Sequence, residues 1–139
     1  MQSKLSIVRI CLTAFALFWP VAPSTAQATP KRVVSMNLCT DQLAILIAGP
    51  NQLYSVSYLA VDPEGSVMYE AAKNFPLNHG LAEEVFMMQP DLVLAGTFTS
   101  RATVAMLKHL KFDVQEFPPS YSFPQIREQI ARMGRLLGR

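Results

Sequence analysis

The sequence predicts an α/β fold: a three-layer lobe with a mostly parallel sheet of about four strands. After residue 31, short apolar or β-branched runs alternate with longer stretches that have helical periodicity. One short run, LVLAG at residues 92–96, contains no polar side chain, which is typical of a parallel strand covered on both faces. Strands separated by helical crossovers all end at one edge of the sheet, and in Rossmann-like folds that edge binds the ligand.

The expected strands and helices alternate along the chain. The first helix ends at Gly49-Pro50, a common helix terminator, and the last begins with the capping pair Ser122 and Gln125. The last helix has an amphipathic stripe, which the lobe's own sheet can cover, formed by Phe123, Ile126, Ile130, Met133 and Leu137. We expect strands at residues 32–37, 53–59, 92–96 and 113–117, and helices at residues 39–48, 66–75, 81–89, 100–111 and 122–137.

The first 28 residues have the features of a secretory signal peptide. Lys4 and Arg9 precede the short apolar run ICLTAFALFWPVA, and the pattern Ala26-Gln27-Ala28 follows it. The run is shorter than the roughly 20 residues that a membrane span needs. We therefore expect cleavage after residue 28, a mature lobe at residues 29–139 and a periplasmic location. The net charge of +2 belongs to the signal segment, so the mature lobe is nearly neutral and has no basic patch for nucleic acid.

Four short segments follow the expected strands and should lie together at the ligand edge of the sheet. They are residues 36–38, 58–59, 97–99 and 119–121. Their side chains are apolar, aromatic or neutral and polar, which suits a flat or bulky ligand held by contact area and a few hydrogen bonds. Taken singly, each aromatic residue is equally well explained as part of the core. The candidate ligand contacts are Leu38, Tyr58, Phe98 and Tyr121.

Cys39 stands at the first strand–helix junction, where a helix N-terminus favours the thiolate form of a nucleophile. A nucleophile also needs a base. His109 is expected late in a helix at the opposite edge of the sheet, and His79 in a loop whose position the sequence does not fix. We favour Cys39 as a small buried packing residue beside a helix capped by Asn37 or Thr40. An exported α/β enzyme that uses Cys39 is the alternative.

The sequence contains no motif for a resident cofactor, metal or nucleotide. The first strand is not followed by GxGxxG, and GxxxxGK[ST] does not occur. No pair of carboxylates lies at the expected strand ends, and His79 stands alone as a possible metal ligand. We therefore expect no catalytic residue, no metal site and no cofactor.

The stretches RVVSMNLCTDQLAILIAG, YSVS, GLAEEVFMMQPDLVLAG and DVQEF together resemble the N-terminal lobe of the helical-backbone periplasmic binding proteins, over residues 31–139. That family delivers vitamin B12, ferric siderophores and haem to ABC importers. The resemblance implies capture of a metal chelate without catalysis, delivery to an ABC permease, and membrane contact only through that permease. It also implies that Glu83, which precedes PDLVLAG, pairs with arginines of the permease. A helix-dipole acid without a partner is the alternative for Glu83.

Two departures limit what the resemblance implies. Gly96 and Leu77 stand where the vitamin B12 binder of the family has tryptophans, and the one tryptophan of the chain, Trp19, lies in the signal segment. A corrinoid, a ferric siderophore and haem therefore all stay open as the ligand. Family members also have two lobes joined by a long helix, and we expect the second lobe to be absent from this chain. A fragment without a competent site is the further alternative.

Overall fold

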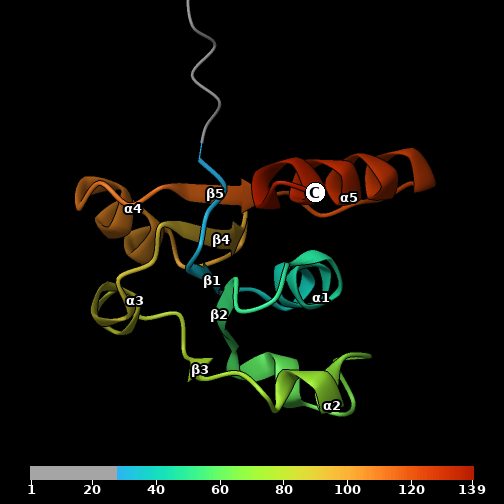
Figure 1. Cartoon of the computed structure of the whole chain (residues 1–139), viewed down its shortest axis with the longest axis horizontal. Helices are drawn as coiled ribbons and strands as arrows, with labels where there is room; N and C mark the ends of the chain where they lie inside the picture. The colour runs from blue at the N-terminus through green and yellow to red at the C-terminus, as the bar shows by residue number, and fades with distance from the viewer. Residues whose placement is uncertain (1–27) are drawn as a thin grey trace, which may run out of the picture.

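The computed structural model describes residues 28–139, so the predicted signal peptide up to residue 27 lies outside the described residues. The described chain forms a five-stranded parallel sheet in the order β3-β2-β1-β4-β5 (Figure 1). The order changes direction between β1 and β4, and ligands bind at the carboxyl ends of the strands at such a switch point. The strands are β1 (Val33–Ser35), β2 (Leu53–Ser57), β3 (Leu77–Asn78), β4 (Leu92–Gly96) and β5 (Val114–Phe117).

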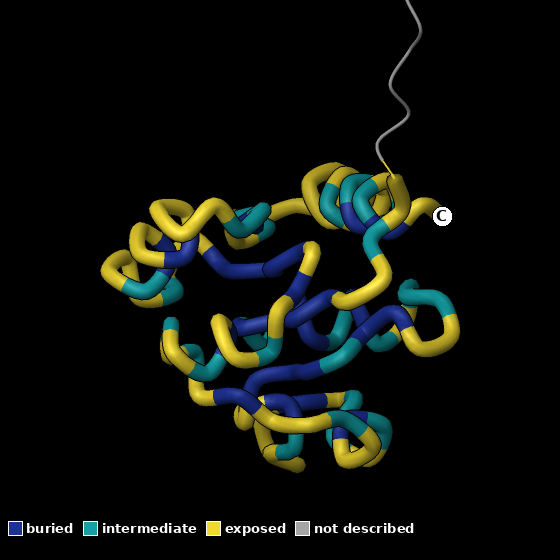
Figure 2. The backbone as a smooth tube through the Cα atoms, turned by 60° about the vertical axis from the view of Figure 1, so that its left-hand side comes forward, coloured by how far each residue is buried: buried dark blue, intermediate teal, exposed yellow. Residues whose placement is uncertain are grey.

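Helices cover both faces of the sheet. One face carries α1 (Leu38–Ile47) and α5 (Phe123–Leu137), and the other carries α3 (Ala82–Met88) and α4 (Arg101–His109) (Figure 1). Alternate side chains of β4 join the buried cluster on one face or the other, and β1 and β4 are buried throughout (Figure 2). The predicted three-layer α/β architecture is therefore confirmed. None of the described helices combines the length and the apolar character needed to cross a membrane.

The structure adds one strand to the four that the sequence predicts. β3 has two residues, which is too few for a periodic pattern, so the sequence predicts a loop there. Asn78 fixes the position of this strand, because Nδ2 donates to the backbone oxygen of Ser35 and to Ser55 Oγ, both at 2.9 Å. The helix expected at residues 66–75 is also shorter, α2 (Tyr69–Ala72), because turns precede it.

The amphipathic stripe of α5 is only partly covered. Met133 and Leu137 are fully buried, whereas the first three members of the stripe are 80%, 43% and 43% exposed, in the order Phe123, Ile126 and Ile130. The expectation that the sheet covers the whole stripe is therefore wrong. Gln52, just before β2, donates to the backbone oxygen of Leu137 at 3.0 Å. The C-terminal end of α5 is thus fixed at the amino edge of the sheet, and its first turns lie toward the carboxyl edge.

A buried hydrogen-bond network ties α1 to the ends of β1 and β2. The Asp41 carboxylate accepts from the backbone N–H of Ser57 at 3.2 Å and from Ser57 Oγ at 2.5 Å. Ser35 and Thr40 are fully buried, as Asp41 is, and Ser35 Oγ lies 2.7 Å from Thr40 Oγ1. Burial raises the pKa of Asp41 above its ordinary value of 3.8, and hydrogen bonds from Ser35 and Ser57 oppose this effect. The network holds the carboxyl ends of two central strands in a fixed relation.

The start of α1 depends on close contact with β4. Asn37 caps the helix, as predicted, because its Oδ1 accepts from the backbone N–H of Cys39 at 3.0 Å. A Cβ atom on Gly96 would lie 2.7 Å from both Cγ and Nδ2 of Asn37, which is too close for non-bonded atoms. The glycine therefore makes room for the capping side chain, and a stacking side chain at position 96 would displace it.

We predict that Asp41→Asn changes how stability depends on pH. Because the pKa of Asp41 is raised in the folded protein, the folded state retains a proton that the unfolded chain has already released, and wild-type stability falls as the pH rises above 3.8. Asparagine does not titrate, so the variant should gain stability relative to the wild type over this rise. Urea unfolding at a series of pH values measures the difference, with Asp62→Asn at an exposed aspartate as the control. Identical pH profiles for Asp41→Asn and the wild type would contradict the raised pKa.

We also predict that Gly96→Ala lowers the free energy of unfolding by about 1 kcal/mol, the typical cost of losing an N-cap, because the added methyl group displaces Asn37. In an Asn37→Ala background the space is free, so the same substitution should cost less. Urea unfolding of the wild type, the two single variants and the double variant measures this coupling. If the two effects simply add, the residues do not compete for the same space.

Candidate functional site

A groove of about 390 Å³ opens at the carboxyl edge of the sheet, between α1 and α5. It lies at the switch point, because residues that follow β1, β4 and β5 all line it. Such a groove suits a ligand recognised by apolar contact area and a few hydrogen bonds. None of its lining side chains carries a formal charge: Asn37, Cys39, Thr40, Gln42, Leu43, Gly96, Thr97, Phe98, Phe117, Pro118, Pro119, Ser120, Ile126, Gln129 and Ile130.

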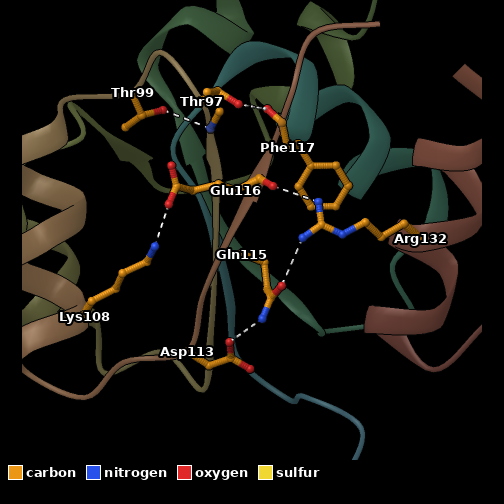
Figure 3. Close-up of polar contacts among 9 residues, drawn as sticks. Thr97, Thr99, Lys108, Asp113, Gln115, Glu116, Phe117 and Arg132 are labelled. Atoms are coloured by element: carbon orange, nitrogen blue, oxygen red, sulfur yellow. Dashed lines mark hydrogen bonds and ion pairs between the residues drawn. The ribbon is translucent and has the colours of Figure 1, made fainter. Parts of the chain in front are cut away.

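Hydrogen bonds fix the loop that follows β4 (Figure 3). The backbone N–H and Oγ1 of Thr97 both donate to the backbone oxygen of Phe117, at 3.0 and 3.2 Å. Thr99 Oγ1 accepts from the backbone N–H of Gly96 at 3.0 Å. Phe98 lies between these two anchors and is 83% exposed. The loop therefore presents a large aromatic side chain at the groove.

The α5 wall of the groove is anchored to β5 by Arg132. Its guanidinium group donates to the backbone oxygen of Glu116 at 2.7 Å and to Gln115 Oε1 at 3.1 Å (Figure 3). The same group lies 4.4 Å from the centre of the Phe117 ring. Because Arg132 holds both a strand and a ring that lines the groove, it sets the position of α5 relative to the sheet.

Gln129, which lines the groove, carries an acceptor that is not satisfied within the described part of the chain. Gln129 Oε1 is buried and accepts no hydrogen bond there. Ile126 and Ile130 line the groove from the same helix. A buried acceptor without a donor costs free energy, so this atom makes the α5 wall less stable than a fully paired wall would be.

The four predicted ligand-contact residues all lie at the carboxyl edge of the sheet, but only one of them lines the groove. Phe98 lines the groove, whereas Tyr121 is 82% exposed in the loop before α5 and does not line it. Tyr58 begins η1, a 3-10 helix (Tyr58–Val61) that follows β2, and Leu38 lies beside the loop that contains Gly65. Sequence reasoning thus identified the edge but not the residues that share one groove.

His79 belongs to a second group of residues, at the ends of β2 and β3. Its ring stacks on that of Tyr58, with 5.3 Å between ring centroids and 23° between ring planes. Its backbone N–H and Nδ1 both contact the Glu84 carboxylate, at 2.6 and 3.0 Å. These contacts lower the pKa of Glu84, and the largest cause is the hydrogen bond from the backbone N–H of His79. Sequence reasoning could not place His79, because its position depends on the unpredicted pairing of β3.

Cys39 is exposed at the start of α1 and lines the groove, so the predicted packing role is wrong. Helix geometry explains the difference, because the first turn buries Thr40 and Asp41 and leaves the cysteine on the solvent side. No histidine and no carboxylate lines the groove beside it. Among the described residues there is also no group of three or more side chains that could hold a metal ion.

Glu83 and Glu84 are adjacent on α3 but differ in their contacts. Glu84 binds His79. The side chain of Glu83 is exposed and makes no hydrogen bond or ion pair with any other described residue. α3 packs on the sheet face opposite to α1 and α5, so the Glu83 surface and the groove belong to different parts of the lobe.

Comparisons with known proteins bear on the fold. No family model and no curated protein matches the chain. Among solved structures, the chain is similar to a periplasmic heme-binding protein from Pseudomonas aeruginosa, with 19% identity and a TM-score of 0.64. It is also similar to the periplasmic vitamin B12-binding protein BtuF of Vibrio cholerae (19%, 0.61) and to the FhuD protein from S. pseudintermedius (21%, 0.61).

Each of these three alignments covers 78% of this chain, but only 39%, 42% and 36% of the respective solved chain. The chain therefore spans about two-fifths of the length of the solved proteins that it matches. At the level of the fold, these similarities confirm the predicted resemblance to one lobe of the periplasmic binding proteins.

Proposed function

We propose that this chain is a ligand-binding lobe of a periplasmic substrate-binding protein. In this proposal it captures a metal chelate, namely a corrinoid, a ferric siderophore or haem, and delivers it to the permease of an ABC importer. The observation that carries the proposal is the uncharged groove at the switch point of a sheet with this fold. Export through a cleaved signal peptide to the periplasm is part of the same proposal.

The chemistry of the groove supports an apolar ligand of some size. Phe98 supplies an aromatic surface from one side, and Ile126 and Ile130 supply aliphatic surface from the other. Complete removal of an apolar side chain of this size from water on ligand binding contributes about 1.5–3 kcal/mol to the free energy of binding. The uncharged polar side chains that line the groove, among them Gln42 and Gln129, would supply the few hydrogen bonds that orient the ligand. Since no charged side chain lines the groove, the proposal assigns recognition mainly to contact area.

The groove supplies one wall of the proposed site. Three aromatic side chains near it are 83%, 82% and 80% exposed, in the order Phe98, Tyr121 and Phe123. In a two-lobed protein these side chains would cover a ligand together with the second lobe. A closed cleft buries about 70–90% of the surface of a small ligand. We therefore expect this chain alone to bind its ligand much more weakly than a two-lobed protein would.

Permease docking is assigned to Glu83. Its side chain is exposed and has no partner among residues 28–139, which leaves the carboxylate available for an arginine of another protein. Glu84 is the poorer candidate, because its carboxylate already binds His79. The position of α3, on the sheet face away from α1 and α5, would let the lobe dock while the groove holds its ligand.

A thiol enzyme is the less supported alternative. Cys39 is exposed in the groove, as a nucleophile must be, but no general base lines the groove with it. His79 is bound to Glu84 at the end of β3, and His109 ends α4. Fast labelling of Cys39 would only reflect its exposure, so labelling alone does not identify a catalytic thiol.

We predict that ferric haem, hydroxocobalamin or a ferric hydroxamate siderophore binds the groove and slows alkylation of Cys39, because that thiol lines it. Phe98→Ala should weaken the binding about tenfold to a hundredfold, as expected for the loss of one large apolar contact. Tyrosine fluorescence quenching measures the affinity, and iodoacetamide labelling measures access to Cys39. Phe86→Ala, on α3, is the matched control. If no probe both binds and protects Cys39, the proposed ligand site is wrong.

We predict that Glu83→Lys leaves ligand affinity unchanged but abolishes uptake of the ligand by cells, because the reversed charge repels an arginine on the permease. Fluorescence titration of the purified variant and uptake of the radiolabelled ligand in the native host separate the two effects. Glu64→Lys, in an exposed loop, controls for the change in net charge. Normal uptake with Glu83→Lys would remove this residue from the docking surface.

A further inference from the structure

The outer surface of α3 and α4 carries several exposed apolar side chains. The two helices pack side by side on one face of the sheet (Figure 1). Met87 on α3 is 77% exposed and Phe86 43%, while Met106 on α4 is 51% exposed and Leu110, which follows that helix, 42%. Phe86 lies edge-on to Phe112, with 6.0 Å between ring centroids, so the apolar surface continues from α3 to the end of α4. An exposed apolar surface that spans two helices is typical of a protein–protein contact.

The two helices carry opposite charges. α3 contains two acidic residues and no basic one, whereas residues 101–111 contain three basic residues and no acidic one. Within the described part of the chain Glu83 makes no ion pair, and neither does Arg101 or Lys111. Lys108 instead pairs with Glu116 on β5, at 2.5 Å. One helix therefore presents an unpaired negative charge, and its neighbour presents unpaired positive charges.

These charges lie at opposite ends of the helix pair. α3 and α4 both run from the carboxyl edge of the sheet to the amino edge, because each of them connects two parallel strands. Glu83 lies in the first turn of α3, and Lys111 lies two residues after the end of α4. A two-fold rotation about an axis perpendicular to this surface exchanges the ends. It would place α3 of one copy on α4 of another, in antiparallel orientation.

We propose that this α3–α4 surface binds the same surface of a second copy of the chain in a two-fold symmetric dimer. Glu83 of each copy then faces Lys111 of the other, and the apolar side chains between these charges are covered. Ala102 and Ala105 are exposed on α4, and their small side chains leave room for Met87 of the second copy. Charge favours a second copy over a uniformly acidic or basic partner, because such a partner complements only one of the two helices.

The dimer does not depend on the identity of the ligand, but it shares Glu83 with the proposed permease contact. A dimer covers Glu83, so the permease would bind only a dissociated copy. The α3–α4 surface lies on the sheet face opposite to α1 and α5, so self-association leaves the groove open. Ligand affinity should therefore be the same in the monomer and in the dimer.

Sedimentation equilibrium of the purified chain, from about 1 μM to about 1 mM, tests this inference over the range in which weak complexes form. We expect the wild type to pass from monomer to dimer, and added salt to favour the monomer. Met87→Lys should weaken the dimer at least a hundredfold, because it places an ammonium group in an apolar contact. Leu46→Lys is the matched control, since Leu46 is 66% exposed on α1, away from this surface. Thermal unfolding verifies that each variant is folded.

Exchange of the two charges tests the symmetry. Glu83→Lys and Lys111→Glu should each weaken the dimer about tenfold, because each substitution occurs twice in a two-fold interface. Both substitutions in one chain should restore the wild-type affinity.

A wild type that stays monomeric would overturn the inference. So would a Met87→Lys variant that dimerises like the wild type, or a combined charge variant no better than the single ones. If the wild type is monomeric and Met87→Lys abolishes ligand uptake by cells, the surface belongs to the permease and not to a second copy. Failure of every ligand probe to bind would defeat the proposed function and leave the dimer standing.

Discussion

The parallel pairing of β1 with β4 is the constraint on which the rest of this structure depends. Val33, Val34 and Ser35 pair in register with Leu92, Val93 and Leu94, and the backbone N–H after β1 donates to Leu94 at 2.8 Å. After β1 the chain turns into α1 on one face of the sheet, and after β4 it turns toward α4 on the other. Because neighbouring connections leave in opposite directions, a crevice opens between them at the carboxyl edge.

Buried polar contacts make that crevice a defined site. Asn37 caps α1 in space that exists only because residue 96 is glycine, and the Asp41–Ser57 contact fixes the first turn of the helix against β2. Asn78 fixes β3 in a similar way. The exposed aromatic residues at the edge are therefore carried by rigid supports. Rigid support reduces the conformational entropy that these side chains lose when a ligand binds.

Much of the fold could be predicted from the sequence, because strands such as LVLAG and helices such as α5 carry strong local patterns. β3 could not, since its two residues are held by the side chain of Asn78 rather than by periodicity. The burial of Cys39 was predicted wrongly, because local pattern does not fix which side of a first helical turn faces the core.

For the candidate site, the sequence predicted only that it lies at the carboxyl edge of the sheet. The topology rule correctly brought the strand ends together, but the division into a groove at Phe98 and a separate group at Tyr58 and His79 depends on strand order and helix placement. The close approach of Gly96 to Asn37 and the contact between His79 and Glu84 are tertiary contacts of the same kind. Residue spacing along the chain does not encode them.

The central claim is that the ligand binds over the carboxyl ends of β1 and β4. Hydrogen–deuterium exchange of the chain, with and without saturating ferric haem or hydroxocobalamin, tests it most directly. We expect slower exchange in residues 37–43 and 97–99 and in the segment 118–130, which line or flank the groove. The amino edge around Gln52 and Gly138 should exchange as in the free protein. Protection confined to the amino edge, or spread evenly over the lobe, would contradict this account.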